Sequence, residues 1–528
     1  MTDGRHDQIG KGLMPDRVTQ FLLFRARRTI RDPARVIRIP RVLASLAMRR
    51  LILPLVFSVT PYFAGRSNTS RTLDVMRREP KMSPLRTKFY FHAGCHLLQQ
   101  SRPQAAWNCF EKCLRGSTDP VHFFTAAVCL LHGLGRAWDA LSCFAHANDL
   151  NLRSAARFGA DRTRYRVLDS FWAANIGHTA TLDYVIKLGH QEGRNADDTI
   201  LYVAPGSRVA NRCLLEQFRP YLKLIEQPAD LPFDEAAIPA LRYDFVWPCG
   251  PDGSTVHFWE VAAKTYRLWY QSGRGALLTL SSEFDARGWQ ALRSKGVPDG
   301  AWFVALHVRA SGSKRHHADL HQVLNADVTS YLPAIAEITR RGGWVIRMGD
   351  PNMVPLPALP NVIDYCHSDL RGDWMDVFIA ARCRFMLGTS SGPAYLPPLY
   401  GVPSVLTNWW PPAQRPWHPM DIFVPKMIRN MRDGRLLTLS ESLVEPFSFC
   451  HAQSYLENVK RVRVEDNAPE LIHSAVVEMF ERIEDNTSND ARICALRRRA
   501  DDIYNSHGAY GMAQLASAFL QNCGSFVN

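Results

Sequence analysis

The sequence lacks several features that would assign its function directly. None of its 12 cysteines stands in a Cys-x-x-Cys pair, so no zinc ribbon or dithiol redox motif is present. The longest apolar stretch, residues 51–59, spans nine residues and contains Pro54, which is shorter than the ~20 residues needed to cross a bilayer. No early apolar segment precedes a small-residue cleavage site, so we expect no secretory signal. The dispersed cysteines indicate a reduced, cytoplasmic protein.

What the chain has in excess is positive charge. The formal net charge is +13 over 528 residues, and the 46% hydrophobic content is ample for about three domains. In residues 1–82 arginines alternate with apolar side chains, which indicates a basic amphipathic arm. Such an arm is either a flexible tail or a peripheral anchor on anionic lipid at the inner face of the plasma membrane. Nucleic acid is not expected as a partner, because no zinc finger or aromatic RNA-binding signature is present.

Residues 83–160 repeat themselves with a period of 34 residues. The small alanines let paired helices approach and the aromatic residues fill the space between them, which predicts an all-α, tetratricopeptide-like segment. Two repeats are fewer than a stable stack needs, so we expect them to dock on the rest of the chain. Their function is open between a surface for a protein partner and a structural cap. The matching pairs are Tyr90 with Phe124, Ala93 with Ala127, Leu97 with Leu131, Ala106 with Ala140, and Phe110 with Phe144.

After the repeats the pattern changes to alternating strands and helices, which predicts an α/β fold with parallel sheets. We expect two Rossmann-like lobes, over residues 161–298 and 299–465, and C-terminal helices over residues 466–528 that pack on the lobes. The strands expected in the first lobe are Val167 to Ile176 and Thr199 to Ala204, with helices Asn211 to Tyr221 and Trp259 to Gln271, and the segment Asp244 to Trp247 helps to complete the lobe. Those expected in the second are Trp302 to Val308, Trp344 to Met348, Asn361 to Tyr365 and Cys383 to Leu387, with helices Tyr331 to Arg341 and Trp374 to Arg382.

A turn of small residues follows the last of these strands. Gly388 and Gly392 let backbone amides approach a ligand closely, and the hydroxyls of Thr389, Ser390 and Ser391 add hydrogen-bond donors. A helix expected to begin near residue 393 would direct unpaired N–H groups at an anion above the strand. The turn is therefore either a phosphate-binding loop or an ordinary turn between a strand and a helix.

Polar residues also end the two neighbouring strands. His307 and Arg309 lie on one face of the first strand, because side chains alternate along a strand. Arg347, Gly349 and Asp350 end the next strand. Ligands of open α/β sheets bind beyond the carboxyl ends of the strands, so the three ends together predict a site for a nucleotide diphosphate. For each residue alone, a structural histidine or a salt-bridging arginine is the competing interpretation.

At this point the chain resembles a known family, the glycosyltransferases of bacterial surface-polysaccharide loci, which are distantly similar to fucosyltransferase-like GT-B enzymes. The resemblance covers roughly residues 165–523 and is strongest after residue 300. The motifs that carry it are LHVR at 306–309, NADVTSYLPAI at 325–335, RMGD at 347–350, DYCHSDLRGDWMDVFIAARCRFMLGTSSGP at 364–393 and GVPSVLTNWWP at 401–411.

This resemblance implies a nucleotide-sugar donor in the second lobe, a glycan or lipid-linked acceptor, and helical repeats ahead of the transferase. His307 and Arg309 look like the His-x-Arg pair that contacts the donor diphosphate and nucleoside in such enzymes. Residues 389–391 look like the second phosphate-binding loop. Arg309 and Arg347 would stabilise the departing charge.

The catalytic base that deprotonates the acceptor is open between His178 and Asp350, each expected at a strand end facing the cleft. No cofactor and no metal are expected. His317 and His321 have helical spacing, but the Glu of a His-Glu-x-x-His motif is missing. The rival interpretation is a non-catalytic tetratricopeptide adaptor with a nucleotide-sugar-binding or degenerate transferase domain. The motifs leave open the donor base, the sugar, the acceptor and the stereochemical outcome.

Overall fold

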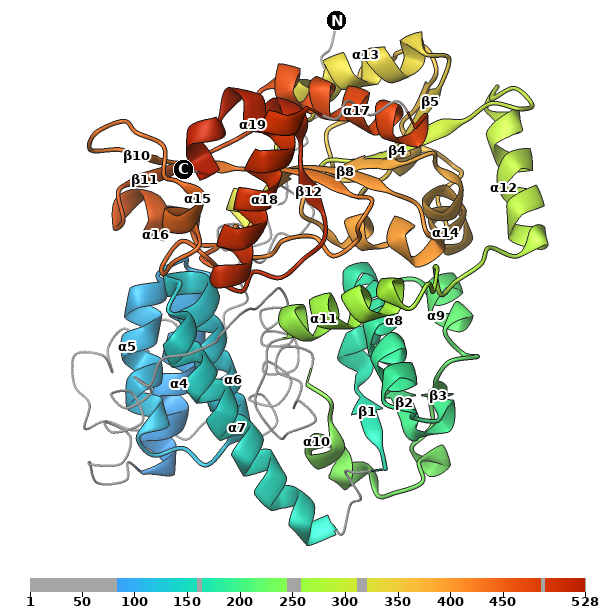
Figure 1. Cartoon of the computed structure of the whole chain (residues 1–528). Coiled ribbons are helices and arrows are strands. Elements are labelled where there is room, and N and C mark those ends of the chain that lie inside the picture. The colour runs from blue at the N-terminus through green and yellow to red at the C-terminus, as the bar shows by residue number, and fades with distance from the viewer. Residues whose placement is uncertain (1–82, 159–163, 245–257, 311–320, 486–489, 528) are drawn as a thin grey trace, which may run out of the picture. The chain divides into compact units, whose positions relative to one another are not determined.

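The computed structural model describes residues 83–158, 164–244, 258–310, 321–485 and 490–527 (Figure 1). The basic arm predicted over residues 1–82 lies outside these ranges, as do His317 and all of the segment Asp244 to Trp247 except Asp244. Within the described ranges, no helix combines the length and the apolar character that a membrane span requires.

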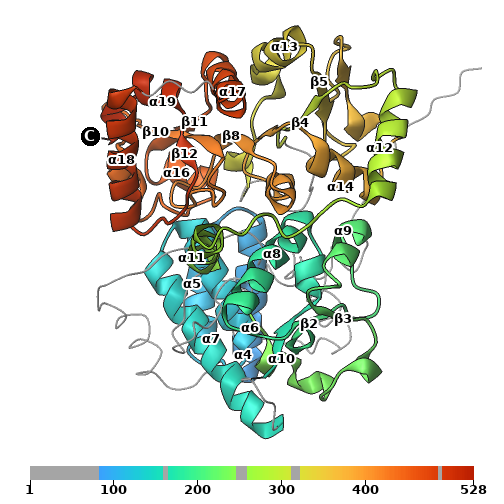
Figure 2. The ribbon, with the colours of Figure 1, turned by 45° about the vertical axis from the view of Figure 1, so that its right-hand side comes forward.

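Residues 84–158 form helices that pack in pairs (Figures 1 and 2). In the first pair, the Phe110 ring approaches Gly94 so closely that a Cβ at Gly94 would lie 2.6 Å from it. In the second pair, the rings of Phe124 and Phe144 are 5.7 Å apart. The first of these contacts joins an aromatic and a small residue, and the second joins two aromatic rings. The elements are α4 (Pro84–Gln99), α5 (Pro103–Leu114), α6 (Pro120–Val128), the π-helical turn η1 (Cys129–Gly133) and α7 (Ala137–Phe158).

The next part of the chain builds a small parallel sheet in the order β1-β2-β3. Its strands are β1 (Arg166–Leu168), β2 (Thr199–Tyr202) and β3 (Lys223–Ile225). The accompanying helices are α8 (Ile176–Gln191), α9 (Arg212–Gln217), α10 (Ile238–Leu241) and α11 (Phe258–Gln271).

The sequence-based boundaries were wrong at two of these elements. The strand expected from Val167 to Ile176 ends at Leu168, because the Asp169 carboxylate accepts a hydrogen bond from the Phe171 N–H at 3.2 Å and starts a 3₁₀ turn. The helix expected from Asn211 to Tyr221 is shorter and ends at Gln217.

The second sheet has seven strands, all parallel, in the order β12-β9-β8-β7-β4-β5-β6. The prediction of an α/β fold with a parallel sheet is confirmed. The strands are β4 (Phe303–His307), β5 (Trp344–Arg347), β6 (Val362–Ile363), β7 (Met386–Gly388), β8 (Ser404–Trp409), β9 (Ile422–Pro425) and β12 (Gln514–Leu515). A separate antiparallel pair joins β10 (Met427–Asn430) and β11 (Val462–Glu465).

Helices cover both faces of the seven-stranded sheet (Figure 1). The Phe303 ring of β4 lies 6.0 Å from Phe378 of α14 (Asp373–Arg382), which packs with α12 (Ser282–Ser294). On the other face, the Phe385 ring lies 5.1 Å from Phe480 of α17 (Pro469–Ile483), which packs with α13 (Leu332–Arg340). The remaining helices are α15 (Leu439–Ser442), α16 (Gln453–Asn458), α18 (Ala491–Ser506) and α19 (Ser517–Asn522).

The helix expected near residue 393 is a 3₁₀ turn of four residues, Gly392–Tyr395, followed by a second turn, Pro397–Tyr400. Pro393, Pro397 and Pro398 explain the difference, because proline has no N–H to donate and disfavours helical geometry in the residue before it. The turn after β7 therefore has no long helix dipole behind it.

Candidate functional site

The carboxyl ends of β4 and β7 are joined by side-chain hydrogen bonds. His307 Nδ1 lies 2.9 Å from Ser391 Oγ, and the Arg309 N–H donates to Thr389 Oγ1 at 3.1 Å. The Thr389 N–H donates to the His307 carbonyl at 3.1 Å, which continues the pairing of the two strands beyond Gly388. The structure thus brings together the His-x-Arg pair and the Thr-Ser-Ser turn that the sequence singled out.

Ser390 joins this loop to the next strand. Its Oγ accepts a hydrogen bond from the Trp410 N–H at 2.7 Å, directly after β8. Because Ser390 is the acceptor in that bond, its own O–H is left to donate. Thr389, Ser390 and Ser391 are all buried, so the loop is held in one shape by bonds to β4 and β8.

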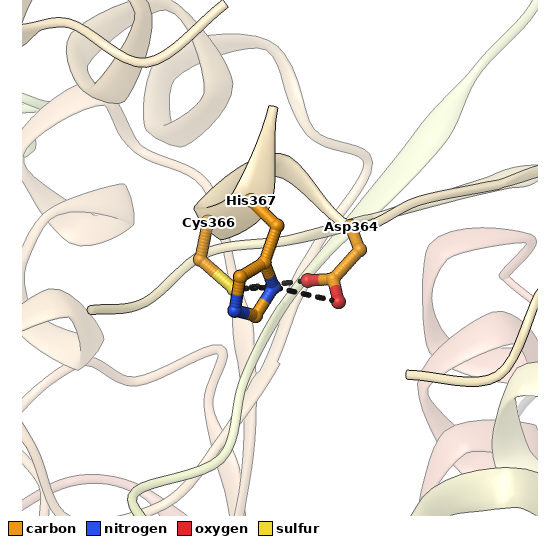
Figure 3. A group of neighbouring side chains, drawn as sticks. All are labelled: Asp364, Cys366 and His367. Atoms are coloured by element: carbon orange, nitrogen blue, oxygen red, sulfur yellow. Dashed lines mark hydrogen bonds and ion pairs between the residues drawn. The ribbon is translucent and has the colours of Figure 1, made fainter. Parts of the chain in front are cut away.

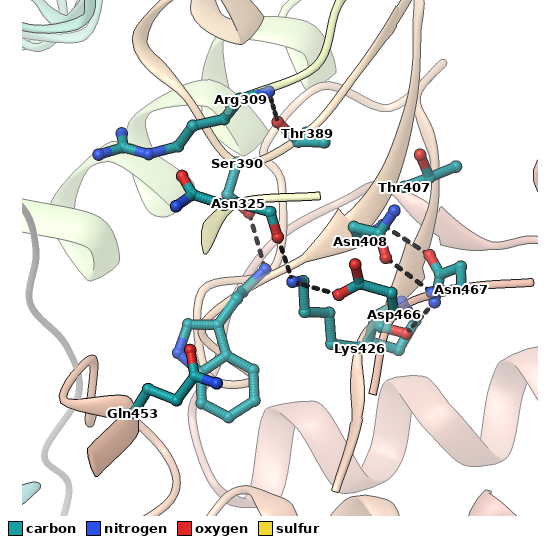
Figure 4. Close-up of polar contacts among 12 residues, drawn as sticks. Arg309, Asn325, Thr389, Ser390, Thr407, Asn408, Lys426, Gln453, Asp466 and Asn467 are labelled. Carbon is teal, nitrogen blue, oxygen red and sulfur yellow. Dashed lines mark hydrogen bonds and ion pairs between the residues drawn. The ribbon is translucent and has the colours of Figure 1, made fainter. Parts of the chain in front are cut away.

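Arg309 carries the charge of this group. Its side chain is half-buried, and its Nε is buried without a hydrogen-bond partner among the described residues. Within the same ranges, no carboxylate forms an ion pair with it. Burial lowers the pKa of the guanidinium, but arginine stays protonated at all physiological pH values. The group is a cation with unused hydrogen-bonding capacity (Figure 4).

His307 is a neutral imidazole in this setting. Burial, followed by the nearby charges of Arg309 and Arg347, lowers the pKa of its ring to about 4. The ring is 5% exposed. His307 therefore acts near neutral pH through hydrogen bonds and shape and adds no positive charge.

Arg347 ends β5 beside this group, but it already has a counter-ion. Its side chain is fully buried, and Nη1 donates to the Val354 carbonyl at 2.7 Å and to Asp364 at 3.2 Å. Its Nε and Nη2 have no hydrogen-bond partner in the part of the chain that the structure describes. The Asp350 carboxylate accepts bonds from the Asn352 backbone at 2.9 Å and side chain at 2.6 Å, so it shapes the turn after Gly349.

His178 lies in the first turn of α8, and the expected position at a strand end was wrong. Its Nδ1 lies 3.3 Å from the Phe171 carbonyl, and its ring packs 4.3 Å from the Phe171 ring. The preceding residue, Gly177, contacts the turn after β7. A Cβ at Gly177 would lie 2.8 Å from the Cα of Gly392, so only a residue without a side chain fits there. The start of α8 thus touches the predicted phosphate loop.

Sequence reasoning missed a polar network beyond β8 and β9 (Figure 4). Lys426, which is 4% exposed, donates to the Asn325 carbonyl at 2.7 Å and to Asp466 at 2.6 Å. Asn408 and Asn467 bond each other, with the Asn467 N–H donating to Asn408 Oδ1 at 2.7 Å. Burial lowers the pKa of Lys426, which Asp466 opposes. Asn325 and Asn408 stand in motifs that carry the family resemblance, whereas the positions of Lys426 and Asp466 carry no local signal.

One group of potential metal ligands is found in the described ranges. Asp364, Cys366 and His367 have ligand atoms within 4.8 Å of one another (Figure 3). Cys366 Sγ donates to Asp364 Oδ1 at 2.9 Å, and burial raises the pKa of the thiol to about 12. The carboxylate is also the counter-ion of Arg347. A protonated thiol and a neutralised carboxylate form a hydrogen-bonded cluster and make weak metal ligands.

Comparisons with known proteins give distant structural similarities. No family model and no curated protein matches the chain. A glycosyl transferase of family 9 from Veillonella parvula is 12% identical, with a TM-score of 0.31 over 46% of this chain and 80% of that chain. The iron-containing dodecameric glycosyltransferase TibC of enterotoxigenic E. coli is 14% identical, with a TM-score of 0.27 over 46% of this chain and 57% of its own.

The heptosyltransferase TibC in complex with ADP-D-beta-D-heptose is 10% identical, with a TM-score of 0.26 over 46% of this chain and 58% of its own. These structures are transferases of sugars, but the scores are low. The site residues themselves therefore have to support the functional assignment.

Proposed function

We propose that this protein is a glycosyltransferase that uses a nucleotide-sugar donor. The observation that carries the proposal is the convergence of Arg309, His307 and the loop 389–391 at neighbouring strand ends of a parallel sheet. A cation without a carboxylate partner in the described ranges, next to a buried loop rich in hydroxyls and glycine, is the arrangement that a diphosphate needs.

In the proposed reaction, an acceptor hydroxyl attacks the anomeric carbon, the bond from that carbon to the diphosphate oxygen breaks, and the nucleoside diphosphate leaves with the electron pair. Arg309 neutralises the charge on the leaving group, and the Ser390 hydroxyl donates to a phosphate oxygen. Donors fixed before the reaction stabilise developing charge without reorganising. Arg347 contributes less charge, because Asp364 offsets it.

The general base remains between His178 and Asp350. His178 is the stronger candidate by position, because it lies in the first turn of α8, next to Gly177, which contacts Gly392 of the turn after β7. The Asp350 carboxylate is occupied in its own turn.

The finer assignments belong to the same proposal. They are a GT-B arrangement of two Rossmann-like lobes, tetratricopeptide-like repeats at residues 83–160 and a reaction without a metal. The acceptor would be a glycan or lipid-linked sugar of bacterial surface polysaccharide synthesis. The enzyme would work in the cytoplasm, with its basic arm on the inner face of the plasma membrane, and the repeats would be available to a protein partner.

A panel of nucleotide sugars tests this proposal against the adaptor rival. The purified chain is incubated with UDP-, GDP- and ADP-linked sugars, with and without acceptor glycans, and release of the nucleoside diphosphate is measured. We expect turnover with one donor class and its loss in Arg309→Ala. Binding of a donor without hydrolysis or transfer, in the presence of a broad set of acceptors, would favour the adaptor.

A further inference from the structure

The imidazole of His451 is buried without the hydrogen bonds that such a group needs. Its ring is 1% exposed, and neither Nδ1 nor Nε2 has a hydrogen-bond partner among the described residues. A buried polar group without a partner destabilises the fold, so it marks a place where a bound ligand, ion or water would supply the missing bond. Thr389, Ser390 and Ser391 of the proposed phosphate loop are buried as well, so burial does not remove His451 from a binding site.

Three histidines from distant parts of the sequence meet at this point. The His451 ring lies 4.7 Å from the ring of His132 and 5.6 Å from that of His321. His132 belongs to η1 in the helical segment, and His321 follows the strand end that carries Arg309. Burial, and then the charges of His132, His321 and Arg309, lower the pKa of His451 well below its usual value.

A chain of hydrogen bonds joins His451 to the phosphate loop. Ser390 accepts from the Trp410 backbone, and the Trp410 indole Nε1 donates to the Cys450 carbonyl at 3.0 Å. The next residue is His451, whose N–H donates to the His132 carbonyl at 2.8 Å. The position of the His451 ring is therefore set from one side by the loop and from the other by the helical segment.

The helical segment is fixed firmly enough to hold this ring. Gly135 has a positive φ of 63°, and a Cβ there would lie 2.0 Å from the Pro446 carbonyl oxygen. The Trp138 N–H, at the start of α7, donates to the Glu445 carboxylate at 2.9 Å. The turn between η1 and α7 thus packs closely against Glu445 and Pro446, a few residues before His451.

The groups around His451 select an anion. Among the described residues, the charged or titratable neighbours that act on it are His132, His321 and Arg309, so this part of the cluster contains bases and a cation. A metal ion is disfavoured by the charge of Arg309. In the described ranges, moreover, only Asp364, Cys366 and His367 bring three ligand atoms within 4.8 Å. An N–H of a neutral imidazole can donate to a phosphate oxygen without becoming charged.

We propose that His451 is a direct contact of the diphosphate bound by Arg309 and that His132 positions it, so that the helical segment completes the donor site. This inference rests on the proposed function and adds a role for the repeats that is neither a docking surface for a partner nor a cap.

Inorganic pyrophosphate is the probe for the test, with binding to the full chain measured by calorimetry. His451→Phe keeps the ring packing and removes both nitrogens, and we expect it to weaken pyrophosphate binding about 10-fold or more, the effect of one hydrogen bond to a charged group. The matched control is His122→Phe, since His122 is also a buried histidine of the helical segment and packs 4.2 Å from the Phe91 ring. We expect the control to bind as the wild type does.

A second measurement covers the case in which His451→Phe does not fold. In wild-type protein labelled at histidine, the ring signal that is missing from His451→Gln should shift on addition of pyrophosphate, and it should not shift in the Arg309→Ala background. His132→Ala should weaken binding as well, and it should broaden the His451 ring signal, which a general loss of stability would not do selectively.

Three outcomes would overturn the inference. They are pyrophosphate affinity unchanged by His451→Phe, no pyrophosphate binding by the wild type, and Zn²⁺ binding that is lost in His451→Phe while pyrophosphate binding is unaffected. Turnover in the panel of nucleotide sugars, measured separately, would leave the glycosyltransferase proposal standing in each case. If no nucleotide sugar is turned over but pyrophosphate still binds in a His451-dependent way, the glycosyltransferase proposal is contradicted and the anion site is supported.

Discussion

The ends of the neighbouring strands β4 and β5 contain similar residues and differ in charge. Arg309 and His307 stand at the end of β4, whereas Arg347 ends β5 and the nearby His367 follows β6. A carboxylate that also follows β6, Asp364, lies between the last two groups, 3.2 Å from Arg347 and 3.0 Å from His367. At β4 no described carboxylate takes this place.

This difference separates a structural cluster from a candidate site. A buried arginine paired with an aspartate is close to neutral and already bonded, so it supports the fold and attracts an anion weakly. An arginine with no counter-ion in the described ranges keeps its positive charge and attracts an anion more strongly. The same sequence pattern, an arginine at a strand end, thus predicts two different roles, and the partner decides between them.

The largest expected effect comes from removing the cation at β4. Arg309→Ala should lower donor turnover by roughly 10²- to 10³-fold, the usual effect of one preorganised group at a leaving charge, and leave the unfolding midpoint near that of the wild type. Initial rates and thermal unfolding measure both. The control is Arg293→Ala, because Arg293 is an exposed arginine of α12 that pairs with Asp299. Wild-type turnover in Arg309→Ala would remove this residue from the mechanism.

At the end of β5, a substitution is expected to lower stability, in contrast to the loss of turnover expected for Arg309→Ala. Asp364→Asn leaves the fully buried Arg347 without its counter-ion, so the free energy of unfolding should fall by about 3 kcal/mol. Urea unfolding measures this, with Asp369→Asn as the control, since Asp369 is an exposed aspartate that pairs with Lys295. If Asp364→Asn were as stable as the wild type, the cluster would not be structural.

The pKa of His307 predicts how stability depends on pH. The pKa of its imidazole is about 4 in the folded state, which is below the unfolded value. At pH values between these two pKa values, the imidazole is protonated in the unfolded chain and neutral in the folded chain. The stabilisation is therefore complete above the unfolded pKa and is lost as pH falls toward the folded one. Between about pH 7 and about pH 5 the wild type should lose about 2 kcal/mol more than His307→Gln. Parallel pH profiles in urea unfolding would contradict the lowered pKa.

A smaller effect is expected at the loop of residues 389–391. Ser390→Ala removes the acceptor of the buried Trp410 N–H and should cost about 1 kcal/mol of stability, with donor binding about 10-fold weaker. Ser390→Thr keeps the hydroxyl and should restore most of the stability. Equal donor affinity in Ser390→Ala and the wild type would limit the loop to a structural role.

The smallest effect is expected from a chelator. If hydrogen bonds hold the cluster of Asp364, Cys366 and His367, EDTA should leave turnover and the unfolding midpoint unchanged. Metal analysis should then give the same metal content for Cys366→Ser as for the wild type. A stoichiometric metal that disappears in Cys366→Ser would turn this structural cluster into a metal site.

Local patterns sufficed for much of the second sheet. Continuous apolar runs located β4 and β5 to within a residue or so at each end, because strands covered on both faces must be apolar throughout. The first sheet was harder. Its strands are three or four residues long, so a side-chain bond such as that of Asp169 was enough to end β1 early.

The sequence by itself determined which residues stand at the strand ends, because chain order and apolar periodicity are local properties. Only the tertiary structure decided which of those residues have partners. Asp364 neutralises Arg347, Trp410 anchors Ser390, and His132 reaches His451 from more than 300 positions away in the sequence. Charge compensation and hydrogen-bond satisfaction depend on distances in space, and no local pattern of residues encodes them.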